Sequence, residues 1–360
     1  MEKCVIPVML PENRAYEIVI GSGAAEELQE LPAKGGRLFV YDDRTLELFG
    51  GCFAGISGGH HSFGRGEADK RIDKVVGICQ AALREKLDRG GVMVAVGGGV
   101  TGDMTGFAAG IYLRGIRCIQ VPTSLLAMVD SSVGGKTAVD LPEGKNLIGV
   151  FHQPQRVLID PGFLRTLPEK ELHCGMAEVI KMAAGFDPEF FAFLAEKGSA
   201  LAGYESFAPF AVKTIARCCE LKAMVVAQDE KESAGGVRAH LNFGHTFGHG
   251  IESAANFRLS HGECVAIGMV IAGFAALKRG VWSESEQQRL ISVLQSAALP
   301  TVPPAELTFA DVLPVMTRDK KNRDGRIPLV LPEKIGKLFT AADLSGAELQ
   351  HCWQLAGGRI

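Results

Sequence analysis

The first half of the chain alternates short runs of β-forming residues with stretches of helical periodicity, and this alternation limits the fold more than any other feature. Five runs have the length and composition of strands, at residues 16–20, 38–41, 93–96, 118–121 and 157–159. Residues 72–87 repeat apolar side chains at helical spacing, and Gly90 and Gly91 follow as a stop signal. Strands that alternate with helices build a mostly parallel sheet. The pattern predicts an α/β domain with a Rossmann-like, mostly parallel sheet over residues 1–163.

The second half of the chain has a different pattern. Beyond about Pro161 the β-forming runs give way to apolar stretches of helix length, at 169–184, 188–196, 207–226, 243–255, 262–279 and 284–297. The apolar run 327–331 follows a charged turn and predicts a small hairpin within 319–336. Because 360 residues exceed what one core usually serves, we expect a second, mainly α-helical domain over residues 164–360. An active site would then lie in the cleft between the domains, at the carboxyl ends of the strands.

Composition excludes several classes of function. The chain is 47% hydrophobic and 22% charged with a formal net charge of −3, unlike a disordered protein or a polybasic nucleic-acid binder. Its nine cysteines form no CxxC pair, which is typical of a reduced cytoplasmic protein. The longest apolar run, 264–277, is shorter than the ~20 residues of a membrane-spanning helix, so we read it as a buried helix. We expect a cytoplasmic protein that acts on neither a membrane nor a nucleic acid.

A glycine-rich turn follows the predicted strand 93–96. It reads GGGVTGD at 97–103 and runs into a helix-compatible stretch. Glycines let backbone N–H groups approach a pyrophosphate, and a helix N-terminus adds a favourable dipole. Asp42, directly after the strand 38–41, could accept hydrogen bonds from an adenosine ribose. The spacing is not GxGxxG, so a tight turn without a ligand is the alternative interpretation.

Residues 122–140 read PTSLLAMVDSSVGGKTAVD and set Asp130, Lys136 and Asp140 among small residues. The stretch 132–137 is typical of an anion-binding turn, although it lacks the GxxxxGK of a P-loop. Lys145 and Asn146 follow closely, so we expect two ammonium groups and an amide near one another. The alternative is a solvated surface loop. The apolar side chains within 125–129 argue against it, because they are expected to anchor the segment in the core.

Acidic and imidazole side chains farther along the chain have the chemistry of metal ligands. Glu178 and Lys181 are three residues apart on one face of an otherwise apolar helix, where a carboxylate needs a partner. His245, His249 and His261, with Glu178, offer the ligands of a catalytic zinc. Spacing alone favours His245 and His249, at i and i+4, as the chelating pair. The alternative is that each histidine is an ordinary core or surface residue.

Taken together and in order, these motifs resemble the 3-dehydroquinate synthase family. The resemblance runs from about residue 16 to 337 and rests on GGGVTGD, YLRG at 112–115, the 122–140 segment, GKNLIGVFHQP, TLP at 166–168, GMAEVIK, LNFGHTFGHGIE, HGE and DKK. It implies the second step of the shikimate pathway, in which 3-deoxy-D-arabino-heptulosonate 7-phosphate gives 3-dehydroquinate and inorganic phosphate. It also implies NAD, used without net consumption, and a zinc or cobalt ion, since His and carboxylate ligands suit both metals.

The resemblance implies a role for individual residues. The metal ligands are Glu178, His245 and His261, which leaves His249 on the substrate side. The catalytic set is Asp130, Lys136, Lys181, Asn242 and His249. The substrate carboxylate is held by Lys222 and Arg238, and its phosphate by Lys136, Asn146, Asn242, Lys320 and, from the neighbouring subunit of a homodimer, Arg114. The NAD site comprises Asp42, Glu67, Lys70, Gly98, Gly99, Val100, Asp103, Thr123, Ser124, Asp130, Lys136, Lys145, Asn146, Thr166, Leu167 and Glu171.

The chain departs from the family pattern in three places. The segment 48–67 is shorter than usual and reads GRGE at 64–67, so Glu67 and Lys70 are placed by their spacing. Two extra residues lie near 234–236, ahead of Arg238. Ser124 stands where the family often has threonine, which preserves the hydroxyl.

Three other functions are compatible with part of this pattern. Another sugar-phosphate cyclase, of the 2-deoxy-scyllo-inosose or valiolone type, would share the NAD and metal residues, but His249, Arg238, Asn242 and the run 319–321 favour dehydroquinate synthase. A polyol dehydrogenase dependent on NAD and metal would release NADH and would need few anion-binding side chains. A dinucleotide-binding regulatory protein on an inactive scaffold would have lost a ligand or clamp residue, and none is missing from the sequence.

Overall fold

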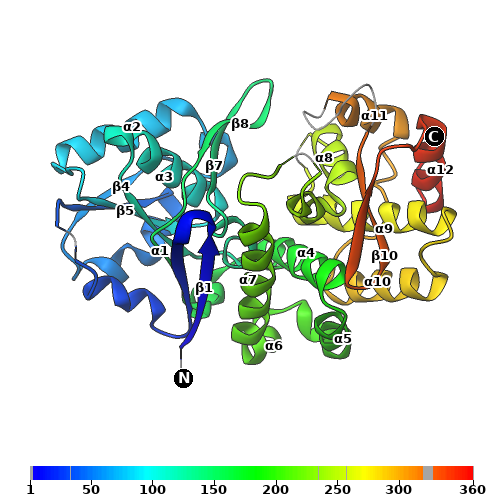
Figure 1. Cartoon of the computed structure of the whole chain (residues 1–360), viewed down its shortest axis with the longest axis horizontal. Coiled ribbons are helices and arrows are strands. Elements are labelled where there is room, and N and C mark those ends of the chain that lie inside the picture. The colour runs from blue at the N-terminus through cyan, green and yellow to red at the C-terminus, as the bar shows by residue number, and fades with distance from the viewer. Residues whose placement is uncertain (1–2, 33, 234, 257, 319–326, 360) are drawn as a thin grey trace. The chain divides into compact units, whose positions relative to one another are not determined.

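Seven strands form the sheet of the first half of the chain (Figure 1) in the computed structural model, which describes residues 3–32, 34–233, 235–256, 258–318 and 327–359. Their order across the sheet is β1-β2-β9-β6-β5-β3-β4. The bounds are β1 Cys4–Leu10, β2 Arg14–Ile20, β3 Arg37–Tyr41, β4 Gly59–Ser62, β5 Val92–Gly97, β6 Arg117–Pro122 and β9 Arg156–Ile159. The β1–β2 pair is antiparallel and the other neighbours are parallel. The mostly parallel sheet is confirmed, and the five predicted strands lie within β2, β3, β5, β6 and β9.

Both faces of this sheet are buried, because successive apolar side chains point to opposite faces. Leu38 and Val40 of β3 join a core with α2 (Ile72–Arg84) and α3 (Gly99–Ile111). Phe39 and Tyr41 join a second core with α1 (Asp43–Phe53) and the short helix Ala24–Gln29. Helices on both faces require strands that are apolar throughout, as these are. The predicted Rossmann-like α/β class is confirmed.

Helix α2 ends before Gly90 and Gly91, the predicted stop. Lys86 takes a left-handed conformation, with φ of 56°, just past the helix end. The N–H of Leu87 then donates to the carbonyl oxygen of Ala82, which closes the last turn. The prediction that Gly90 and Gly91 end this helix was therefore wrong. Lys86 adopts the left-handed conformation in which glycine is usually found.

The strand order places a topological switch between β3 and β5. The chain leaves β3 for β4 on one side, and β5 lies on the other side of β3. Open α/β sheets bind ligands outside the carboxyl ends of their strands at such a switch. Asp42 follows β3 and Gly98 follows β5, so both lie at this edge. The residues predicted to hold a dinucleotide therefore stand where this kind of sheet binds one.

A hairpin of β7 (Lys136–Leu141) and β8 (Gly144–Phe151) packs against α3, in a segment for which no strand was predicted. The register pairs Lys136 with Phe151 and leaves Asn146 beside the turn at the other end. At ~3.3 Å per residue, the backbones of Lys136 and Asn146 are roughly 13 Å apart. Lys136 and Asn146 are therefore close in sequence but their backbones are not neighbours. The two ammonium groups and the amide that we expected near one another could meet only through their side chains.

The second half of the chain is mainly helical, as predicted. Its helices are α4 Glu169–Phe186, α5 Pro188–Lys197, α6 Tyr204–Phe207, α7 Ala211–Gln228, α8 His245–Ala254, α9 His261–Lys278, α10 Glu284–Ser296, α11 Phe309–Arg318 and α12 Gly346–Leu355. A hairpin is formed by β10 (Leu329–Lys334) and β11 (Lys337–Ala341), which pair antiparallel, so only its first strand lies within the range 319–336 predicted for a hairpin. Helices α6, α11 and α12 were not predicted. The expected charged turn lies outside the described residues.

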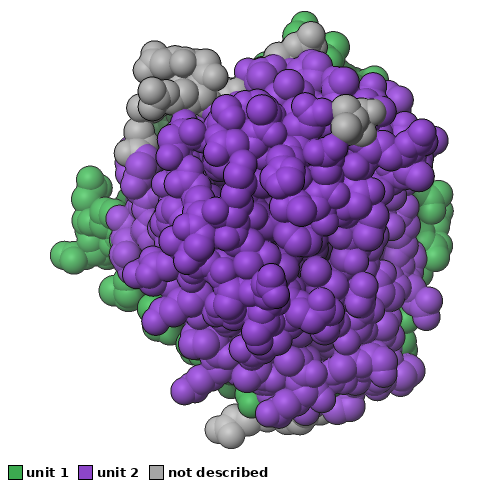
Figure 2. Space-filling view, turned by 90° about the vertical axis from the view of Figure 1, so that its right-hand side faces the viewer, with its two compact units in different colours: residues 1–167, 210–227 green, residues 168–209, 228–360 purple. Residues whose placement is uncertain are grey.

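The chain divides into two compact units, drawn in separate colours in Figure 2. Unit 1 contains residues 1–167 and 210–227, and unit 2 contains residues 168–209 and 228–360. The segment 210–227 lies within the sequence range expected for the second domain, yet it belongs to unit 1. Side chains of α7 explain this, since Cys219 Sγ donates to the Met128 carbonyl oxygen at 3.3 Å. Unit 2 therefore lacks most of α7.

Two glycines allow three helices of unit 2 to approach closely. A Cβ on Gly262, in α9, would lie 2.4 Å from the carbonyl oxygen of Cys174 in α4. A Cβ on Gly268 would lie 1.9 Å from the carbonyl oxygen of Gly244, which directly precedes α8. Both distances are far inside van der Waals contact, so only glycine permits this packing. The start of α9 is thereby held against α4, and the start of α8 against the middle of α9.

Helix α9 is also the one described helix that is long and apolar enough to cross a membrane by length and composition. However, 72% of it is buried inside the structure, as in the core helix of a globular protein. This agrees with the buried helix predicted for the run 264–277.

Gly268→Ala is expected to destabilise unit 2 by about 3 kcal/mol, the upper range for overpacking of a core. The added methyl group meets rigid backbone at 1.9 Å, so α9 must move away from the start of α8. Thermal unfolding measures the effect. Gly346→Ala is the control, because a Cβ there meets nothing within 4 Å. Equal unfolding temperatures for the two variants would contradict the close helix contact.

Candidate active site

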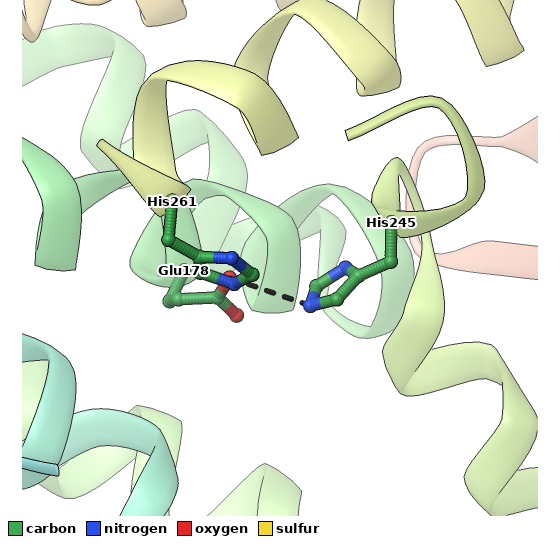
Figure 3. Close-up of side chains that lie close together, drawn as sticks. All are labelled: Glu178, His245 and His261. Atoms are coloured by element: carbon green, nitrogen blue, oxygen red, sulfur yellow. Dashed lines mark ion pairs between the residues drawn. The ribbon is translucent and has the colours of Figure 1, made fainter. Parts of the chain in front are cut away.

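Three potential metal ligands of unit 2 converge from three helices, and their side chains point toward one another in Figure 3. Glu178 lies on α4, His245 is the first residue of α8, and His261 is the first residue of α9. One donor atom from each residue lies within 4.8 Å of the other two. The Nε2 atoms of His245 and His261 are 3.8 Å and 3.6 Å from Glu178 Oε1. Two imidazoles and a carboxylate are thus positioned to share one ion.

Local sequence fixes where the two histidine helices begin. Gly244 has a left-handed conformation, with φ of 79°, and directly precedes His245. Ahead of α9, the Ser260 side chain accepts a hydrogen bond from the Glu263 N–H, and the Glu263 carboxylate accepts one from the Ser260 N–H. This capping box starts α9 at His261. Each imidazole is therefore attached to the well-defined first turn of a helix.

The second ring nitrogen of each histidine is already engaged. His245 Nδ1 lies 3.1 Å from the carbonyl oxygen of Phe243, and His261 Nδ1 lies 3.2 Å from Glu252 Oε2. A proton on Nδ1 leaves the Nε2 lone pair of each ring facing Glu178. Sequence reasoning included Glu252 in the LNFGHTFGHGIE motif but gave it no role. The available signal was its position seven residues after His245, two turns along the same helical face.

Opposite charges are buried together at this site. Glu178 and Lys181 are each 1% exposed and form an ion pair. Burial raises the pKa of Glu178, but the Lys181 charge and His261 outweigh it and hold that pKa well below its usual range. Burial lowers the pKa of His261, but hydrogen bonds with Glu178 and Glu252 outweigh it and raise the pKa to about 9. Without a metal, the site therefore contains a protonated His261 at neutral pH.

The donor set fits zinc or cobalt. Both carboxylate oxygens of Glu178 are buried, and their polar neighbours among the described residues are the paired Lys181 and the two imidazoles. Two imidazole nitrogens and a carboxylate oxygen are a ligand set of catalytic zinc, and they suit cobalt as well. The ring of His249 lies beside this group, with its centroid 5.3 Å from that of His245 and 5.8 Å from that of His261. The structure groups His245 with Glu178 and His261, whereas spacing alone had favoured His249.

Zinc affinity is expected to fall about tenfold per pH unit below the pKa of His261, because one proton must leave before the ring binds metal. The pKa is raised from 6.5 to about 9, so this proton stabilises the metal-free fold below pH 6.5, and the stabilisation is lost as the pH rises through 9. Competition against a chelator of known affinity over this pH range measures the slope. A pH-independent affinity would show that His261 carries no proton in the metal-free protein.

In unit 1, Lys222 and Asp130 form a second charged pair. Lys222 Nζ is 2.7 Å from Asp130 Oδ1 and 2.6 Å from the Asp130 carbonyl oxygen. The lysine side chain is 7% exposed and the aspartate side chain 27%. Two residues that are 92 positions apart in sequence are thereby brought together, and the aspartate side chain stays partly exposed.

A third group joins the start of α3 to the β7–β8 turn. Lys70 Nζ donates to Asp103 Oδ2 and to Asn146 Oδ1, both at 2.6 Å. Lys145 forms an ion pair with Glu67 at 3.1 Å. Five of the residues predicted for the NAD site therefore lie in one cluster, although the shortened segment had left Glu67 and Lys70 the least secure.

The turn after β5 fits a pyrophosphate. Helix α3 begins at Gly99, so its first N–H groups have no partner within the helix. A Cβ on Gly98 would lie 3.4 Å from Ser124 Oγ, and one on Gly99 would lie 3.1 Å from Ser131 Oγ. A side chain at Gly99 would be crowded and one at Gly98 would make ordinary contact, so this turn, next to Val100, is compatible with a pyrophosphate and with a tight turn that holds no ligand.

Asp42 has a structural task in addition to the predicted one. Its Oδ1 accepts a hydrogen bond from the Thr45 N–H at 2.8 Å and caps α1. Its Oδ2 lies 3.5 Å from Thr101 Oγ1, at the β3–β5 switch. Both carboxylate oxygens of Asp42 therefore already accept a hydrogen bond within the protein.

Arg238 and Asn242 lie on the short helix Val237–Asn242 of unit 2. Arg238 is 2% exposed, and its Nη1 donates to the carbonyl oxygen of Glu230. Asn242 Nδ2 donates to Glu232 Oε1 at 3.1 Å. Both side chains thus contact the loop that carries the extra residues.

The remaining predicted residues are dispersed along the two units. Arg114 is exposed with φ of 68°, Lys136 is exposed at the start of β7, and Glu171 lies in the first turn of α4. Thr123 follows β6, and Thr166 and Leu167 end the short helix Pro161–Thr166. Lys320 lies outside the described residues.

Comparison with known proteins places the chain among its relatives. Residues 60–174 match the family described as 3-dehydroquinate synthase N-terminal, and residues 175–322 match that described as 3-dehydroquinate synthase C-terminal. The chain is 44% identical to the 3-dehydroquinate synthase of Microcystis aeruginosa over 346 residues, which are 92% of this chain and 93% of that protein. It is 42% identical to the 3-dehydroquinate synthase of a Nostoc species over 97% of this chain and 99% of that protein.

Solved structures of related fold are similar over nearly the whole chain. A 2-epi-5-epi-valiolone synthase from Streptomyces hygroscopicus with NAD+ and Zn2+ bound is 28% identical with a TM-score of 0.85, over 97% of this chain and 99% of that one. A 2-deoxy-scyllo-inosose synthase complexed with carbaglucose-6-phosphate, NAD+ and Co2+ has a TM-score of 0.86 at 24% identity, over 98% and 99% of the two chains. The second likeness concerns the fold alone.

Proposed function

The chain belongs to the 3-dehydroquinate synthase family, and from this premise we propose that it converts 3-deoxy-D-arabino-heptulosonate 7-phosphate to 3-dehydroquinate and inorganic phosphate. The observation that carries the proposal is the 44% identity over 92% of the chain, against 28% for the valiolone synthase of the same fold. The reaction uses a metal ion and NAD. The donors Glu178, His245 and His261 of unit 2 are suited to the metal, and the β3–β5 edge of unit 1 is suited to the dinucleotide.

Glu178, His245 and His261 are the proposed metal ligands. A zinc or cobalt ion held by three protein ligands polarises substrate hydroxyls as a Lewis acid. Lys181 keeps the Glu178 carboxylate ionised through their buried ion pair. His249, whose ring lies beside those of both ligand histidines, exchanges a proton with the substrate through a ring nitrogen.

NAD is proposed to bind at the β3–β5 edge of unit 1. NAD bound there would supply reversible hydride transfer with the substrate, without net consumption of the cofactor. Gly98, Gly99 and Val100 bind the pyrophosphate through backbone N–H groups, and Asp42 binds the ribose. Thr123, Ser124, Thr166, Leu167 and Glu171, with the cluster around Lys70 and Asp103, complete the site. That cluster orients Asn146 by a hydrogen bond from Lys70.

The anionic ends of the substrate require cations. We assign the substrate carboxylate to Lys222 and Arg238, and its phosphate to Lys136, Asn146, Asn242, Lys320 and the Arg114 of a second subunit. Asp130 accepts from Lys222 in the structure and so keeps this ammonium charged and oriented. A protein of net charge −3 thereby gathers its positive charge where a dianionic phosphate binds.

A homodimer is proposed because exposed apolar side chains directly precede Arg114 in the sequence and recur on β8. Exposed apolar side chains cluster on β8 and at the end of α3, namely Ile111, Leu113, Leu147, Ile148, Val150 and Phe151. Gly110 and Val150 are in contact, which joins the two parts of this surface. A contiguous exposed apolar patch is typical of a subunit interface. A second copy that covers it would receive Arg114 from its neighbour.

Mixed dimers of Arg114→Ala and His245→Ala subunits are expected to be active, although each variant alone is not. If Arg114 acts in the neighbouring site, a mixed dimer contains one site with both an intact His245 and an intact Arg114. Phosphate release after the two variants are unfolded together and refolded measures the recovery. Two inactive parents with an equally inactive mixture would place Arg114 in its own subunit's site.

The reaction itself is tested by incubating the purified protein with catalytic NAD, zinc and the substrate, while phosphate and 3-dehydroquinate are measured together. Equal appearance of both products without accumulation of NADH is expected. Net NADH would identify a dehydrogenase, and no turnover of a metal-loaded protein would favour another sugar-phosphate cyclase. We further propose that the protein works in the cytoplasm, since all nine cysteines are free thiols.

A further inference from the structure

We propose that Glu252 is a positioning residue that fixes the orientation and tautomer of His261 and so determines the metal affinity of the site. The proposal rests on the metal site proposed above. It assigns a task to a carboxylate that closes the LNFGHTFGHGIE motif but to which neither the motif nor the ligand set gave a role. Glu252 is 6% exposed and lies on α8, the helix that also carries His245.

The two ring nitrogens of His261 face two different carboxylates. Nδ1 is 3.2 Å from Glu252 Oε2, within hydrogen-bond distance, whereas Nε2 is 3.6 Å from Glu178 Oε1. Only Glu178 joins the group whose donor atoms lie within 4.8 Å of one another. Glu252 is therefore placed to accept a proton held on Nδ1, and this leaves Nε2 as the atom that binds metal.

The same task at His245 is performed by the backbone. There Nδ1 lies 3.1 Å from the Phe243 carbonyl oxygen, two residues earlier in the chain. The residue that precedes His261 is Ser260, whose N–H and side chain are committed to the capping box with Glu263. The acceptor for His261 comes instead from a neighbouring helix. One helix, α8, thus carries the first metal-binding histidine and orients the second.

This geometry distinguishes orientation from direct ligation. An acceptor at Nδ1 needs only a lone pair, so Glu252→Gln can retain the hydrogen bond through its amide oxygen. Glu252→Ala removes the acceptor and leaves a cavity beside the ring. Loss of such a partner typically lowers metal affinity about 10- to 100-fold. We expect that loss for alanine and a much smaller one, about threefold or less, for glutamine.

The experiment is a titration of the metal-free full-length protein with Zn2+ in competition with a chromophoric chelator. Co2+ absorption spectra report the ligand geometry independently of activity. Glu263→Ala is the matched control, because it loosens the start of α9 without facing the His261 ring. Circular dichroism confirms that each variant is folded, and Glu252→Gln keeps the test decisive if the alanine variant does not fold.

Weakened binding in Glu252→Ala, with near-normal affinity and Co2+ spectrum in Glu252→Gln, would support the proposal. Affinity within twofold of the parent protein in the alanine variant would overturn it. An equal loss of zinc affinity in Glu252→Ala and Glu252→Gln would also overturn it, because Glu252 would then be a metal ligand. An equal loss of affinity in Glu263→Ala would overturn it as well, because the cause would then be the loosened start of α9. Normal metal binding by a parent protein that forms no 3-dehydroquinate would reject the proposed reaction and leave this inference standing.

Discussion

His245→Ala is expected to lower turnover by about 10³-fold or more, since a Lewis acid contributes several kcal/mol and each 1.36 kcal/mol is tenfold in rate. The Nε2 atom of His245 is one of three donors that converge within 4.8 Å, and two ligands alone hold zinc weakly. NAD binding should be unchanged, because the proposed nucleotide residues that the structure joins at the β3–β5 edge all belong to unit 1. Bound zinc, NAD affinity and phosphate release are measured on the same preparation.

His351→Ala is the matched control for this substitution. His351 is exposed on α12 and has no part in the His245 group. It should keep both its zinc and its rate. If His245→Ala retained stoichiometric zinc and a normal rate, the ligand assignment would be wrong. Loss of NAD affinity together with zinc would show instead that the substitution disturbs more than unit 2.

The sheet could be predicted from the sequence because its buried strands are apolar throughout and short. Two of the strands that escaped prediction lack this signal. β4 reads GHHS, and β8 exposes most of its residues, so neither has the composition of a buried strand. β1 alternates buried and exposed positions at the sheet edge, as in Val8 and Met9. It reads CVIPVML and is apolar throughout, but Pro7 interrupts the run, which a strand tolerates at the edge of a sheet.

The site shows where sequence spacing stops being informative. His245 and His249 share a helical face, and this local relation suggested a chelating pair. The group that converges instead joins Glu178 to residues 67 and 83 positions later, because Gly262 and Gly268 let α9 pack against two other helices. The spacing of residues within one helix does not predict a contact between different helices. Before the structure, the ligand set Glu178, His245 and His261 was therefore implied only by the resemblance to the family.

Lys181→Met is expected to destabilise the metal-free protein by about 3 kcal/mol, the lower end of the range for breaking a buried ion pair. The Lys181 and Glu178 side chains are both 2% exposed, so the substitution leaves a carboxylate with little solvent. We expect the lower end because protonated His261 still compensates part of the carboxylate charge, with its Nε2 atom 3.6 Å from Glu178 Oε1. Unfolding of unit 2, followed by its helical signal, should begin about 6–12 °C lower, at 2–4 °C per kcal/mol.

Zinc should return much of this stability, since a divalent cation bound at Glu178 replaces the missing ammonium. The increase in unfolding temperature on zinc addition is therefore expected to be larger in Lys181→Met than in the parent protein. The double variant Glu178→Gln with Lys181→Met has no buried charge to compensate, so it should be more stable than Lys181→Met alone when metal is absent. That order of stabilities separates the charge effect from simple loss of packing. If the double variant were the less stable of the two, methionine would be damaging the core by its shape, and the Glu178–Lys181 pair would contribute little.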